Sequence, residues 1–81
     1  MRAVDLAVGF FPDRAKAIRR LYLKDEQFRS ICEDLFLAQA SLRQFEGKPD
    51  AETLEEVKDF RTVLQELKAE LRAYLDASGR Y

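Results

Sequence analysis

An apolar repeat between residues 28 and 45 constrains the fold of this chain more than any other feature. Apolar side chains recur there at alternating intervals of three and four residues, at Phe28, Ile31, Leu35, Ala38, Leu42 and Phe45. This spacing aligns them along one side of a single α-helix, as in the seam of a coiled coil. Such a seam needs a second apolar surface to cover it, so the pattern predicts a partner helix.

A second repeat of the same kind occupies the C-terminal part of the chain. It consists of Val57, Phe60, Leu64, Leu67, Leu71 and Tyr74, and is widened by Leu54, Val63 and Leu75. Gly47 and Pro49 lie between the two repeats, and these residue types end helices. Asp50 is a suitable N-cap, and the acidic residues after it favour a helix start: Glu52, Glu55 and Glu56. We therefore predict helices over residues 26–46 and 50–77.

A connection of only three or four residues separates these two helices, which makes them antiparallel neighbours. The predicted core of this hairpin is Phe28, Ile31, Leu35, Leu42, Phe45, Val57, Phe60, Leu64, Leu67 and Leu71. A short connection also predicts a register. It places Leu42 opposite Leu54 or Val57, Ala38 opposite Phe60, Leu35 opposite Leu64, Ile31 opposite Leu67, and Phe28 opposite Leu71.

A shorter helix is predicted over residues 12–24. Proline and an acidic residue suit the first turn of a helix, as at Pro12 and Asp13. Asp25 ends this helix and is placed to cap the next one. The last helix is longer than the middle one, so we expect the first helix to dock on the excess, near Leu71, Tyr74 and Leu75.

Residues 1–11 form an apolar segment, MRAVDLAVGFF. Its sequence is compatible with a short helix broken at Gly9 or with an extended arm, and propensity does not decide between them. The segment is too apolar to remain uncovered. It either caps the core of its own chain or exchanges with a neighbouring copy and helps an oligomer to form.

The 81 residues suffice for one domain, 1–81, with a core of marginal size. The chain has no histidine and one cysteine, which removes the commonest general base, the commonest metal ligand and any intrachain disulfide. Cys32 lies mid-helix beside the seam and reads as a small core residue. The carboxylates near Glu33 and Glu52 lack the histidines of helical metal sites. We expect no catalytic residues, no metal and no cofactor.

Two surfaces remain as candidates for binding. A basic stripe on the first helix would suit an anionic partner such as RNA, a membrane surface or an acidic protein: Arg14, Lys16, Arg19, Arg20 and Lys24. The alternative interpretation is a solvated face, because the net charge of −1 and the lack of aromatic stacking residues are unusual for a nucleic-acid-binding domain.

The second surface is apolar. A hairpin with one short extra helix leaves large side chains that need cover, which usually marks an interface: Phe10, Phe11, Phe36, Leu37 and Val63. We therefore predict a homo-oligomer, with a dimer that pairs two hairpins into a four-helix bundle as the favoured form.

The spaced residues also resemble a known family. The pattern runs from Phe11-Pro12-Asp13 through Asp25, Phe28 and Phe45-Glu46 to Leu67–Leu71 and Tyr74-Leu75. It is similar to the YdcH-like family of short bacterial helical-hairpin proteins, whose function is uncharacterised. This chain departs from that family in its apolar segment before Phe11, and in having Phe36, Leu37 and Ala38 where the family has histidine and asparagine. The resemblance implies a helical hairpin and supplies no catalytic residues.

Together these patterns predict an all-α, cytoplasmic, non-enzymatic protein that acts as a homo-oligomeric interaction or adaptor module for itself and for another protein. No apolar run approaches the roughly 20 residues of a membrane span. The second hypothesis is an accessory nucleic-acid- or ribosome-associated binder that uses the basic first helix.

Overall fold

The computed structural model describes residues 2–49 and 55–78, and these ranges contain helices and no strand. The elements in chain order are α1 (Ala3–Phe10), the 3₁₀ turn η1 (Pro12–Arg14), α2 (Ala15–Lys24), α3 (Glu26–Glu46) and α4 (Glu55–Ser78). The predicted all-α class is confirmed for this part of the chain. The predicted helix positions at residues 50–54, with Asp50, Glu52 and Leu54, lie outside the described residues.

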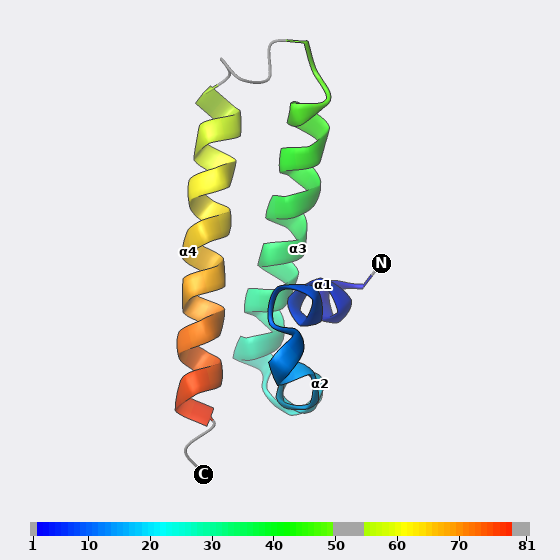
Figure 1. The fold of residues 1–81 in the computed structure, drawn as a ribbon, viewed down its shortest axis with the longest axis vertical. Helices are drawn as coiled ribbons and strands as arrows, with labels where there is room; N and C mark the ends of the chain where they lie inside the picture. Colours follow the sequence, from blue (N-terminus) through cyan, green and yellow to red (C-terminus); the bar gives the residue numbers. More distant parts are fainter. Residues whose placement is uncertain (1, 50–54, 79–81) are drawn as a thin grey trace.

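The two long helices lie side by side and run in opposite directions (Figure 1). They make the molecule elongated, with extents of 47 × 22 × 21 Å. The two apolar repeats meet between them, and Phe28, Leu35 and Leu71 are fully buried there. Of the other predicted core residues, some are buried (Ile31, Leu42, Val57 and Leu64) and some are half-buried against them (Phe45, Phe60 and Leu67).

The register of this pair differs from the predicted one. The ring of Phe60 stacks on Phe45, with centroids 5.5 Å apart, although the short connection placed Phe60 opposite Ala38. At the other end, the ring of Phe28 contacts Tyr74 at 5.4 Å, about one turn beyond Leu71. The predicted register was wrong, because it was drawn from an assumed connection length rather than from the side chains that fill the interface.

The N-terminal segment is a helix and not an extended arm. Helix α1 runs continuously through Gly9, where an added Cβ would meet no atom within 4 Å. Val4, Leu6 and Ala7 are buried, and α1 packs mainly against α3 of its own chain. The helical alternative was therefore correct, but the predicted break at Gly9 was wrong, because a glycine facing open space does not interrupt the backbone hydrogen bonds of a helix.

The helix predicted over residues 12–24 is divided in two. Pro12–Arg14 form a 3₁₀ turn, and the α-helix starts at Ala15. Helix α2 buries Ile18 and packs mainly on α3 and α1 rather than on the end of α4 (Figure 1). Asp25 caps α3 as expected, since its carboxylate accepts a hydrogen bond from the amide of Phe28 at 3.1 Å.

The buried interface between α3 and α4 yields a first prediction. Leu64 is 6% exposed, so Leu64→Asp places an unpaired charge in the core, which costs about 3 to 5 kcal/mol of a total stability of roughly 5 to 10 kcal/mol. We expect this variant to lose most of its helical circular dichroism at 25 °C. The neighbouring exposed residue gives a control, Gln65→Asp, which should melt close to the wild type. A folded Leu64→Asp protein would mean that the core is assigned incorrectly.

Candidate functional site

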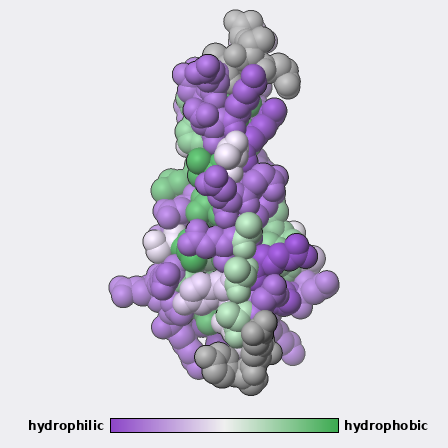
Figure 2. Space-filling view, turned by 90° about the vertical axis from the view of Figure 1, so that its left-hand side faces the viewer, coloured by the Kyte–Doolittle hydropathy of each residue, from purple (hydrophilic) through white to green (hydrophobic). Residues whose placement is uncertain are grey.

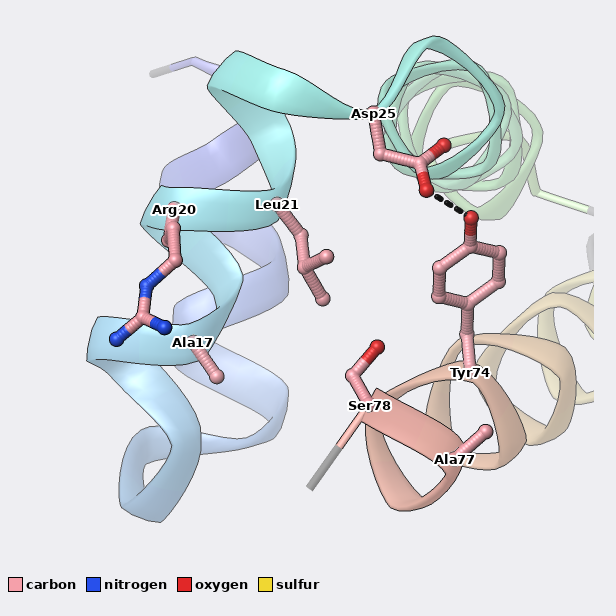
Figure 3. Close-up of a pocket in the computed structure, with 7 residues that line it drawn as sticks. All are labelled: Ala17, Arg20, Leu21, Asp25, Tyr74, Ala77 and Ser78. Carbon is pink, nitrogen blue, oxygen red and sulfur yellow. Dashed lines mark hydrogen bonds between the residues drawn. The ribbon is translucent and has the colours of Figure 1, made fainter. Parts of the chain in front are cut away.

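A groove between α2 and the C-terminal end of α4 contains the most closely coupled polar side chains of the described chain. It is lined by Ala17, Arg20, Leu21, Asp25, Tyr74, Ala77 and Ser78 (Figure 3). The figure shows the Tyr74 hydroxyl pointing at the Asp25 carboxylate across the groove, while Arg20 extends away from both. The groove therefore holds one hydrogen-bonded acid–phenol pair and one separate cation.

The pair in this groove is structural in character. The Tyr74 hydroxyl donates to Oδ2 of Asp25, while Oδ1 accepts from the amide of Phe28. The hydrogen bond from Tyr74 is the main cause that lowers the pKa of Asp25, and the amide of Phe28 adds to it. The same bond to Asp25 raises the pKa of Tyr74. Each group thus stabilises the resting protonation state of the other, which ties the start of α3 to α4 and leaves neither poised for acid–base catalysis.

Cys32 is the single thiol of the chain, and it is inaccessible. Its exposed fraction is 0%, and burial, followed by the nearby charge of Glu33, raises its pKa to about 11. A thiol with such a pKa is protonated at neutral pH and is a poor nucleophile. Cys32 therefore packs as a small core residue, as its position beside the seam suggested.

The described ranges contain no cluster of side chains that would bind a metal ion. Residues 2–49 and 55–78 contain no group of three or more histidine, cysteine or carboxylate side chains able to hold a metal ion. Glu33 is exposed on α3, and Glu55 and Glu56 are exposed in the first turn of α4, where the helix dipole favours negative charge.

The basic stripe is divided by its ion pairs. Arg14 forms an ion pair with Asp76 at 2.7 Å, and Arg19 lies 3.8 Å from Asp5. The remaining members make no polar contact with any described residue: Lys16, Arg20 and Lys24. Leu23 lies on the same helix and is 78% exposed, and the sequence analysis did not single it out. All five cations are exposed, and the three without a polar contact lie on the same helix as the exposed Leu23.

The candidate interface residues fall into two groups. Phe10, Phe11 and Phe36 are half-buried against the core of their own chain, and Lys68 Nζ lies 4.0 Å from the ring centroid of Phe10. Leu37 and Val63 are exposed, at 63% and 42%. The structure thus brings the N-terminal phenylalanines into the fold and leaves Val63 and Leu37 on separate helices at the surface. Figure 2 shows hydrophobic atoms among the mostly hydrophilic surface around α4.

Charge on α4 is segregated by side, a feature that sequence reasoning also missed. Three exposed carboxylates share the side of Val63, at spacings of four, three and four residues along the helix: Asp59, Glu66 and Glu70. The basic residues share another side, the one that Phe10 and Phe11 approach: Lys58, Arg61, Lys68 and Arg72. The three- and four-residue spacing of the charged residues, read in the same way as that of the apolar residues, would have revealed this separation of charge.

Comparison with known proteins identified no related protein. No family model, curated protein or solved structure matches this chain. The resemblance to the YdcH-like family therefore stays a prediction. Among the described helices, none is long and apolar enough to cross a bilayer.

The Asp25–Tyr74 bond leads to a pH-dependent prediction. A carboxyl group whose pKa is lowered on folding contributes stability above its unfolded pKa, ordinarily 3.8, and loses it as the pH falls through the folded value. Tyr74→Phe removes the main cause of that shift. We expect its melting temperature to be lower than that of the wild type at pH 7, and the difference to shrink below about pH 4.

Thermal melts of both proteins at a series of pH values measure this difference. Tyr22→Phe is the matched control, since the Tyr22 hydroxyl makes no hydrogen bond with the described residues. A Tyr74→Phe deficit that is constant from pH 3 to pH 8 would show that the lost stability comes from packing and not from the ionised pair.

Proposed function

We propose that this protein is a small helical interaction module that self-associates through the exposed apolar side of its hairpin. The observation that carries this proposal is an apolar patch on α4, formed by Phe60, Val63 and Leu67 at intervals of three and four residues. Phe45 of α3 extends it by stacking on Phe60. We call these four residues the Val63 patch.

The chain's own N-terminal helices approach α4 on a different side. Phe10 and Phe11 line a groove with the face of α4 that contains Lys68, Ala69 and Arg72. Phe60 and Leu67 are only half-buried, and Val63 is 42% exposed. A contiguous apolar patch on a small protein, bordered by polar residues, is typical of an interaction site.

Energetic considerations support association. A chain of 81 residues buries a smaller fraction of its surface on folding than a larger domain does, so its stability is marginal on its own. Complete burial of one valine or leucine side chain contributes about 1.5 to 3 kcal/mol, and binding of a second copy stabilises the folded state further by mass action. Covering the Val63 patch is therefore a direct route by which such a short chain gains stability.

The test of this proposal is the oligomeric state. Sedimentation equilibrium of the wild type at 10 to 200 µM, on the order of typical weak homodimer affinities, should show reversible association. Val63→Asp should weaken it by about tenfold or more, because a charge replaces an apolar side chain that the contact desolvates. Thr62→Asp, an exposed neighbour on another side of α4, is the control. A wild type that stays monomeric over this range would refute the proposal.

A second candidate function is binding of an anionic partner by α2. The observation that favours it is the absence of polar contacts between Lys16, Arg20 or Lys24 and the described residues. A nucleic acid is favoured less than an acidic protein, because the exposed residue at the centre of these cations is Leu23 and not an aromatic ring on which a base stacks.

A salt titration separates these partners. Nucleic-acid binding through three cations should be measurable with mixed RNA at 20 mM salt, and it should fall steeply by 200 mM. Lys16→Glu combined with Arg20→Glu should abolish it, whereas Lys58→Glu should change it little. If the wild type does not bind RNA even at the lower salt concentration, the nucleic-acid function is wrong.

A further inference from the structure

The Val63 patch has an acidic border. Asp59 precedes Val63 by four residues, Glu66 follows it by three, and Glu70 follows Glu66 by four, so all lie on one side of α4. All three carboxylates are exposed, and none is paired with a described cation. We call Asp59, Val63, Glu66 and Glu70 the acidic face. It presents an apolar centre with negative charge on both sides of it.

This border argues against a symmetric contact between two acidic faces. Such a contact would bring carboxylates of one copy close to those of the other, and like charges across an interface oppose association. The surface that suits the acidic face has the opposite pattern, with positive charges around an exposed apolar side chain.

Helix α2 presents that pattern. Lys16, Arg20 and Lys24 follow one another at intervals of four residues, and Leu23 follows Arg20 by three, so these side chains lie toward one side of the helix. Leu23 is 78% exposed, the largest exposure among the exposed large apolar residues of the described chain. The three cations make no polar contact with described residues. We call these four residues the basic face.

We infer that the basic face of one copy docks on the acidic face of a second copy, with Leu23 against Val63. This inference rests on the proposed self-association and names the surface that covers Val63. The two faces are similar in length, since residues 16–24 span roughly 12 Å of helix and residues 59–70 span roughly 17 Å. Three cations then face three carboxylates around one apolar contact, which supplies both affinity and orientation.

The contact is heterologous, because it joins two different surfaces of identical chains. An experiment can therefore distinguish this contact from the symmetric pairing of two hairpins. A variant damaged in one face retains the other, so two variants damaged in different faces still form one intact contact when mixed. In a symmetric contact between two acidic faces, by contrast, a variant damaged only in the basic face would associate as the wild type does.

The experiment uses two charge-reversal variants of the full chain. The acidic-face variant carries Glu66→Lys and Glu70→Lys, and the basic-face variant carries Lys16→Glu and Arg20→Glu. All four positions are exposed, and circular dichroism checks that both variants keep the wild-type helix content. Glu33→Lys, an exposed charge reversal on α3, is the control and should associate as the wild type does.

Sedimentation of each variant alone should show association weakened by about tenfold or more, and an equimolar mixture should form a one-to-one complex. Raising the salt from 50 to 500 mM should weaken wild-type association, because the charges are largely screened. A wild type that associates while the variants associate equally well, or while their mixture does not recover, overturns this inference and leaves the proposed self-association intact. A monomeric wild type overturns both.

Discussion

The burial of two apolar seams against each other is the interaction on which the rest of this structure depends. Phe28, Leu35 and Leu71 are fully buried, and the helices that carry them, α3 and α4, form the most extensive helix–helix contact of the described chain. Most helical stability in proteins comes from packing of an amphipathic face rather than from helix propensity. The pair thus stabilises both helices and provides the surface on which α1 and α2 fold.

The N-terminal helices complete this core from one side. Ala7 and Ile18 are fully buried, and Asp25 joins the end of α2 to α3 and, through Tyr74, to α4. The polar groups at this junction are matched to one another, and the thiol of Cys32 is buried.

The exposed surfaces of α4 and α2 have opposite character. The N-terminal phenylalanines approach α4 near Lys68 and Arg72, and the side with Val63 keeps its carboxylates and its apolar exposure. Helix α2 turns Ile18 inward, so its cations and Leu23 face outward. One chain therefore displays both an acidic and a basic surface, each with an apolar centre, and a protein of this kind has the means to recognise its own copies.

The three- and four-residue intervals by themselves determined the helical class and the buried positions at Phe28, Leu35 and Leu71, because the period of a helix dictates which side chains share a face. The antiparallel pairing of the long helices followed from the short connection predicted between them. The N-cap at Asp25 was also predicted from the sequence, since capping depends on adjacent residues. Only the tertiary structure decided the register, the path of α1 through Gly9 and the exposure of Leu23. Register depends on how aromatic rings such as Phe45 and Phe60 fill the interface. Exposure depends on which neighbouring helix covers a face. Neither is a property of the local sequence.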